Sequence, residues 1–98
     1  MPTLQELTDR VRAVVSSHPD LSRPVTLDLG ETGLIHMSDG VVGNTDGPAD
    51  CRITLSADDL ESMIESRLDP TMAYMSGQLR LDGDMPLALQ LASALRGA

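Results

Sequence analysis

The segment from Met85 to Leu95 constrains the fold more than any other, because as a helix it is apolar over well more than half of its circumference. Its apolar positions are Met85, Leu87, Ala88, Leu89, Leu91, Ala92, Ala94 and Leu95. The polar strip is narrow and contains Pro86, Gln90, Ser93 and Gly97, which are spaced three or four apart. An ordinary surface helix has an apolar stripe about 100° wide. We therefore expect one sheet to cover only part of this helix, and another subunit, a partner or an apolar ligand to cover the rest.

Length, composition and net charge limit the class of protein and the kinds of partner. The 98 residues fit a single domain, residues 1–98, and 41% apolar against 22% charged residues indicate a globular protein. Seven Lys and Arg against fifteen Asp and Glu give a net charge of −8. That balance argues against nucleic acid or an anionic membrane surface as the main partner, since both attract basic patches.

Targeting and redox features indicate a cytoplasmic protein. No apolar run approaches the roughly 20 residues that span a bilayer, and the N-terminus MPTLQEL lacks the basic and apolar regions of a signal peptide. The last residues, Arg96-Gly97-Ala98, form neither a peroxisomal nor a prenylation signal. A single cysteine fits a reducing compartment. We expect no integral membrane association.

Periodicity predicts a helix followed by a strand meander. Thr3 and Glu6 have the spacing of a capping box, and apolar residues then recur on one helical face until Pro19. Apolar and polar residues alternate in three short segments, over residues 25–29, 35–38 and 41–42. Asp39-Gly40 joins the last two segments as a two-residue hairpin turn, because both positions tolerate positive φ.

The second half alternates strands with helices. A fourth strand places Cys51, Ile53 and Leu55 inward, and a helix capped by Ser56 carries an apolar stripe that ends at Leu68. Three further elements follow: a two-turn helix from Pro70, capped by Asp69 and closed by Gly77, a fifth strand over 78–82, and the last helix, which opens at Gly83-Asp84.

The sequence contains no signature of catalysis, a metal site or a cofactor site. His18 lies at a helix end and His36 on the outward phase of a strand, where each is more often a solvated or capping histidine than a base. No G-x-S-x-G elbow occurs, and one cysteine cannot build a zinc site. We predict that the protein is not an enzyme and has no cofactor.

Three segments of the C-terminal half, taken together in order, resemble the sterol carrier protein 2 family. They read ADCRITL (49–55), LDPTMAYMSGQLRLDGDM (68–85) and LALQL (87–91). The resemblance implies an α+β fold, with a five-stranded, mostly antiparallel mixed sheet and helices over one face, enclosing an apolar tunnel. It also implies binding of lipids without covalent chemistry. Pro86 stands where the family has Gly, and Gln78 and Gln90 replace lysines, which weakens the implied preference for acyl-CoA. A bacterial-type single-domain member fits best.

Two functions of different classes follow. The first is binding, and possible transfer, of an apolar lipid such as a fatty acid, a fatty acyl derivative or a sterol or isoprenoid. Four of the six methionines lie between residues 63 and 85, and methionine adapts to varied shapes. We expect the cavity lining to include Met63, Met72, Met75, Leu79, Met85, Leu89 and Ala92. The alternative is an interaction protein whose last helix mediates dimerisation or presents a lipid intermediate, such as a quinone precursor, to an enzyme.

Overall fold

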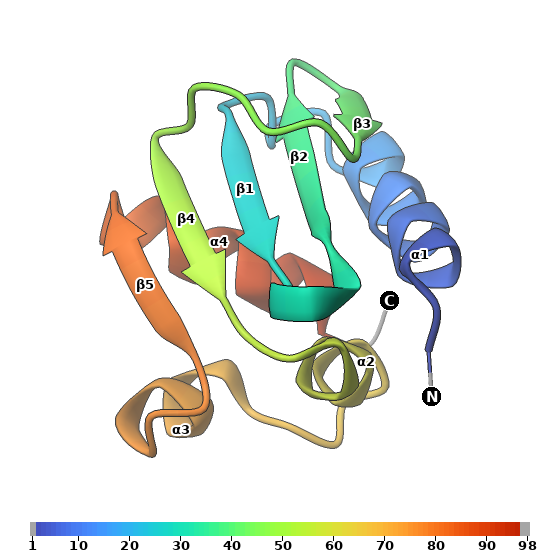
Figure 1. Cartoon of the computed structure of the whole chain (residues 1–98). Coiled ribbons are helices and arrows are strands. Elements are labelled where there is room, and N and C mark those ends of the chain that lie inside the picture. Colours follow the sequence, from blue (N-terminus) through green and yellow to red (C-terminus); the bar gives the residue numbers. More distant parts are fainter. Residues whose placement is uncertain (1, 97–98) are drawn as a thin grey trace.

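The computed structural model describes residues 2–96, which form an α+β fold built on a single five-stranded sheet (Figure 1). The elements in chain order are α1 (Leu4–Ser17), β1 (Val25–Asp28), the short 3-10 helix η1 (Gly30–Thr32), β2 (Leu34–Ser38), β3 (Val41–Gly43), β4 (Cys51–Thr54), α2 (Ala57–Ile64), α3 (Pro70–Met75), β5 (Arg80–Gly83) and α4 (Met85–Leu95).

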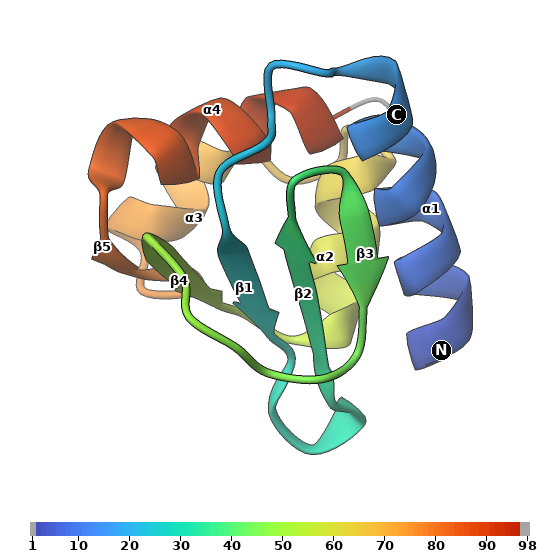
Figure 2. The same cartoon turned by 90° about the horizontal axis from the view of Figure 1, so that it is seen from above.

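The sheet is mixed and mostly antiparallel, as predicted. Its strand order is β3-β2-β1-β4-β5. The pairs β1–β2, β2–β3 and β4–β5 are antiparallel, and only β1–β4 is parallel. Figure 1 shows α4 crossing behind the strands, and Figure 2, seen from above, shows α4 running along one side of the sheet with α1 beside β3.

Local sequence signals set the boundaries of the helices. Each of the four α-helices begins at an N-cap whose side-chain oxygen accepts a backbone N–H: Thr3 from Glu6, Ser56 from Asp59, Asp69 from Thr71 and Asp84 from Leu87. The sequence predicts the caps at Thr3, Ser56 and Asp69, and Asp84 lies in the Gly83-Asp84 pair at which it predicts that the last helix opens. Such caps satisfy N–H groups that have no partner within the helix. The hairpin turn is confirmed as well, because Asp39 and Gly40 have φ of 53° and 82°.

Two predicted boundaries are wrong. α2 ends at Ile64 rather than near Leu68, because Ser66 adopts φ of 63° and breaks the helix. β5 begins at Arg80 rather than at residue 78. The backbone N–H groups of Gln78 and Leu79 both donate to the carbonyl oxygen of Ala73, so these residues close α3 instead of extending the strand.

The core lies between the sheet and the helices. Its strand side chains alternate as predicted, with Cys51, Ile53 and Leu55 all buried. α4 contributes more to this core than the sequence suggested. It contacts β4 and β5 together with α1, α2 and α3, and it buries Leu87, Ala88, Leu91, Ala92 and Leu95.

The expectation that a large part of α4 remains uncovered is therefore corrected. The sequence argument considered one sheet, whereas three helices also pack around α4. Met85 and Ala94 are partly buried, and Leu89 is the large apolar side chain of α4 left exposed. Gly97, assigned to the polar strip, lies outside the described residues.

Candidate functional site

The structure separates the seven side chains predicted to line a cavity. Three of them are buried in the core: Met63, Leu79 and Ala92. Three others are exposed, namely Met72, Met75 and Leu89, and Met85 lies between these two sets as a partly buried residue. A tunnel lined by these seven residues therefore stays a prediction.

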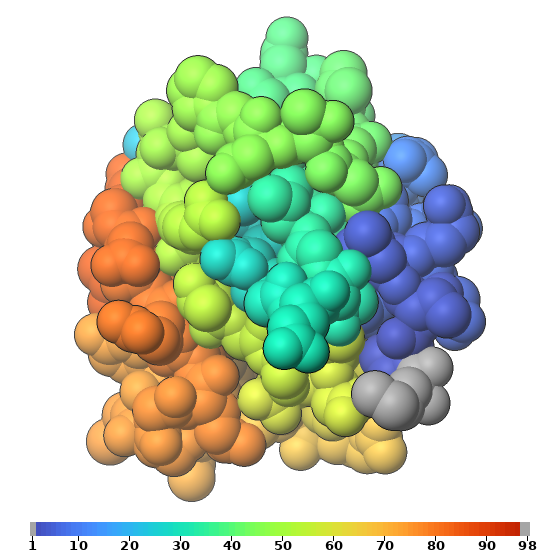
Figure 3. Space-filling view, in the orientation of Figure 1, coloured from blue at the N-terminus to red at the C-terminus, as the bar shows by residue number. Residues whose placement is uncertain are grey.

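The exposed members gather on two helices that pack against each other. Met72, Tyr74 and Met75 on α3 are 66%, 43% and 79% exposed, and Leu89 on α4 is 38% exposed. α3 contacts α4, so we call these four residues the α3–α4 apolar surface. In Figure 3 the light-orange segment that contains α3 lies at the lower edge of the molecule. Exposed apolar side chains that form one patch are typical of ligand or partner sites, so these residues are the candidates for such a site.

α3 is held to the domain by few side chains. It has six residues, of which only Pro70 and Ala73 are buried. Short segments with few buried apolar contacts open at a low free-energy cost. Directly after α3, the backbone N–H of Leu79 donates to the carbonyl oxygen of Ala73, and the side chain of Leu79 is buried in the core.

A separate hollow of about 590 Å³ opens between α1 and α4. It is lined by Arg10, Ala13, Val14, Ser17, His18, Ser93, Ala94 and Arg96. Its volume is in the range of small-molecule sites. None of these residues belonged to the predicted site. The spacing of positions 10, 13, 14 and 17 places them on one helix face, but nothing local could pair that face with the end of α4.

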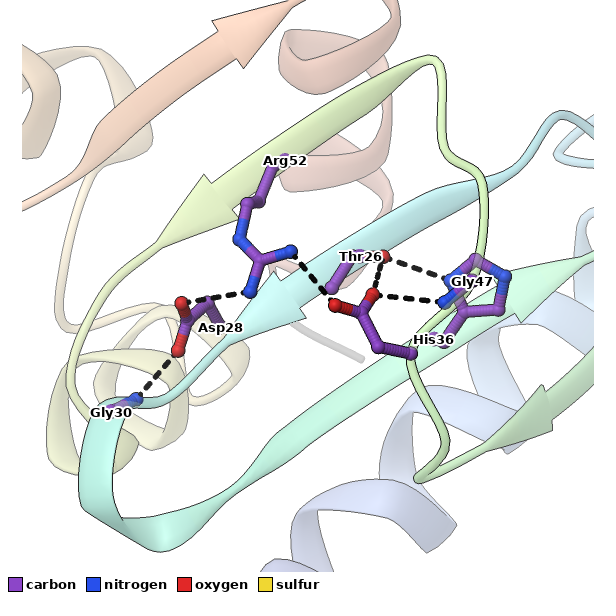
Figure 4. A network of polar contacts seen from close by, with 7 residues as sticks. Thr26, Asp28, Gly30, His36, Gly47 and Arg52 are labelled. Atoms are coloured by element: carbon purple, nitrogen blue, oxygen red, sulfur yellow. Dashed lines mark hydrogen bonds and ion pairs between the residues drawn. The ribbon is translucent and has the colours of Figure 1, made fainter.

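The face of the sheet that the helices leave uncovered carries a polar network rather than an apolar site (Figure 4). Buried Thr26 contacts His36 Nδ1 through its Oγ1 at 2.8 Å and donates to Asp46 Oδ1 at 3.3 Å. Arg52 donates to Asp46 Oδ2 at 3.3 Å and to Asp28 Oδ2 at 3.0 Å. The network fixes the loop after β3 over the strands, and His36 takes part in it through its hydrogen bond with Thr26.

Electrostatics in this network favour the ionised carboxylates. The Arg52 guanidinium and the Gly47 N–H hold the pKa of Asp46 below its usual value. The Gly30 N–H and Arg52 do the same for the pKa of Asp28. Hydrogen bonds and an opposite charge both stabilise the charged form. These groups satisfy one another, and the arrangement is that of a structural cluster.

Metal binding and membrane crossing find no support in the described part of the chain. Among residues 2–96 no group of three or more His, Cys, Asp or Glu side chains is placed to hold a metal ion. The helices there are all too short or too polar to cross a bilayer.

Comparison with known proteins identifies the family. The model of the SCP-2 sterol transfer family matches residues 1–96. The chain belongs to this family. Among curated proteins, hydroxysteroid dehydrogenase-like protein 2 of Bos taurus is 43% identical over 49 residues, which is 50% of this chain and 12% of that protein. This SCP-2 chain thus corresponds to a small part of that relative.

Solved structures of the family share the fold. Sterol carrier protein 2 like 2 from Aedes aegypti matches with a TM-score of 0.75 at 20% identity, over 92% of this chain and 94% of that one. Sterol carrier protein 2 from Aedes aegypti, in complex with the C16 fatty acid palmitate, also has a TM-score of 0.75, at 13% identity over 91% and 90%. The SCP-2 chain therefore has the family fold that its sequence predicted.

Proposed function

We propose that this protein binds an apolar lipid without chemically changing it, and that the ligand is a fatty acid, a fatty acyl derivative or a sterol or isoprenoid. Family membership and the palmitate bound by a protein of the same fold support the proposal. The observation that carries it is the α3–α4 apolar surface, which holds four of the five large apolar side chains exposed among the described residues, the fifth being Val41 on β3.

The proposed mechanism is displacement of α3. A lipid chain would first contact Met72, Met75 and Leu89, and movement of α3 would then admit it toward Leu79 and the other buried residues of the predicted lining. Transfer of the chain from water supplies about 0.8 kcal/mol per buried CH₂, before the cost of ordering the ligand and the helix. Methionine side chains suit this role because they adapt their shape to the guest.

Native mass spectrometry tests the proposal. We expect the purified protein to carry a co-purified apolar mass, or to form a one-to-one complex when palmitate is added to delipidated protein. Hydrogen exchange should then slow in α3 relative to the ligand-free protein. Absence of any complex with palmitate, a long-chain alcohol or a sterol would contradict the proposal.

The same spectra test the alternative that the last helix, α4, mediates dimerisation or contacts an enzyme to which it presents a lipid intermediate. That alternative predicts a stoichiometric dimer in which no lipid is present, or a complex with the partner enzyme. Transfer and storage are distinguished by a further assay. A transfer protein accelerates the movement of a labelled fatty acid between two vesicle populations, whereas a storage protein only lowers its free concentration.

A further inference from the structure

The distribution of ion pairs singles out the hollow between α1 and α4. All seven cationic side chains of the sequence are arginines. Four of them pair with carboxylates: Arg12, Arg23, Arg52 and Arg67. Within residues 2–96, Arg10, Arg80 and Arg96 have no carboxylate at ion-pair distance, although acidic residues outnumber basic ones two to one. Two of these three arginines line the same hollow.

The hollow combines these cations with an apolar wall. Arg10 is partly buried on α1, and Arg96 lies at the end of α4. The apolar part of the lining consists of Ala13, Val14 and Ala94, and Ser17, Ser93 and His18 add polar groups. His18 Nδ1 lies 2.9 Å from the carbonyl oxygen of Val14, a contact that fixes the ring at the end of α1.

We propose that this hollow binds the anionic head group of an amphiphile, a carboxylate or a phosphate monoester, between Arg10 and Arg96, with the adjoining apolar part against Ala13, Val14 and Ala94. Guanidinium groups form strong, directional hydrogen bonds to both kinds of oxyanion. The net charge of −8 repels anions at long range, so recognition depends on these two arginines. The inference rests on the proposed function only in taking the ligand to be a lipid.

Four ligands test the proposal against the full chain: palmitate, hexadecyl phosphate, hexadecanol and inorganic phosphate. Binding is measured by calorimetry for the wild-type protein and for the double variant Arg10→Gln/Arg96→Gln. We expect the double variant to bind palmitate and hexadecyl phosphate roughly tenfold more weakly or worse, because charge-assisted hydrogen bonds are lost, and to bind hexadecanol as the wild type does. Arg80→Gln is the matched control, since Arg80 is the third unpaired arginine but lies on β5.

Amide NMR shifts show where on the protein palmitate binds. Addition of palmitate should move the signals of Ala13, Val14 and Ala94 in the wild type and not in the double variant. The single variants Arg10→Gln and Arg96→Gln give the same reading if the double variant does not fold.

The outcomes distinguish this inference from the proposed function. Equal palmitate affinity in the wild type and the double variant would overturn the inference and leave the proposed function intact. If the wild type binds neither palmitate, hexadecyl phosphate nor hexadecanol, both are overturned. If inorganic phosphate binds as tightly as hexadecyl phosphate, the hollow is an anion site without a lipid component, which also overturns the inference.

Discussion

Arg23 Nη2 donates a hydrogen bond of 2.7 Å to Asp84 Oδ2, while Oδ1 of the same carboxylate accepts the N–H of Leu87 at 3.1 Å. Asp84 therefore caps α4 and at the same time ties it to the segment before β1. Arg23 also donates to Asp50 Oδ2 at 3.0 Å. This one guanidinium thus links three segments that are far apart in the sequence.

The two roles of Asp84 can be separated by substitution. Asp84→Asn keeps an oxygen that can cap the helix but removes the negative charge, so we expect a small loss of stability. Asp84→Ala removes the cap and the ion pair, and it should lower the urea midpoint further. Urea unfolding of both variants checks this order. Equal midpoints for the two would show that the cap contributes nothing measurable.

Acid should destabilise the protein in a defined range. The pKa of Asp28, Asp46 and Asp84 lies below the usual 3.8, owing to backbone N–H donors and the guanidinium groups of Arg52 and Arg23. Because the folded-state pKa is lower than the unfolded one, the stabilisation is complete above about pH 5 and is lost as the pH falls below 3.8 toward the folded-state values. Urea midpoints at a series of pH values measure this.

Arg52→Gln provides the control for the acid transition. It removes the cation shared by Asp28 and Asp46, so the midpoint should fall at pH 7 and change less on acidification. If Arg52→Gln had the same pH dependence of stability as the wild type, the acid transition could not be assigned to the pairing of Arg52 with Asp28 and Asp46.

Gly83 occupies a position that no side chain fits. A Cβ there would collide with the carbonyl oxygen of Asp50 and lie 2.9 Å from Cys51 Cα, at a backbone φ of +96°. We expect Gly83→Ala to cost roughly 2–4 kcal/mol of unfolding free energy. Gly77 has a similar φ of +83° but open space around it, so Gly77→Ala should cost only about 1–2 kcal/mol. If denaturant unfolding gave the same loss of stability for Gly83→Ala and Gly77→Ala, the close approach of Gly83 to the backbone of Asp50 and Cys51 would be refuted.

Leu89→Arg tests the α3–α4 apolar surface. Leu89 is 38% exposed, so the variant should fold, but its guanidinium would have to be buried beside the lipid chain. Uptake of a fluorescent fatty acid should weaken by roughly tenfold or more. Val41→Arg is the control, because Val41 is 72% exposed on β3, away from α3 (Figure 1). Unchanged uptake in folded Leu89→Arg would count against this surface.

Cys51 should be unreactive in the folded protein. Burial, followed by the nearby charge of Asp84, raises the pKa of its thiol to about 11, and the residue is 2% exposed. Since the thiolate is the reactive form, a disulfide reagent at pH 8 should modify Cys51 slowly in buffer and rapidly in urea. Fast modification of the native protein would contradict the burial.

The sequence by itself determined what depends on near neighbours. Thr3, Ser56, Asp69 and Asp84 begin their helices because a cap contacts residues two or three positions away. Asp39-Gly40 turns the chain because its backbone tolerates positive φ. The ordered segments of the C-terminal half also identified the family, and with it the parallel pairing that makes the sheet mixed.

Only the tertiary structure decided which apolar residues are covered. Met63 and Met72 have similar side chains in neighbouring helices, yet one is fully buried and the other 66% exposed, because burial depends on which helices pack over a position. Periodicity shows that a face is apolar but not what lies opposite. For the same reason the presence of Arg10 and Arg96 in one hollow could not be predicted, since it requires that α1 and α4 pack against each other.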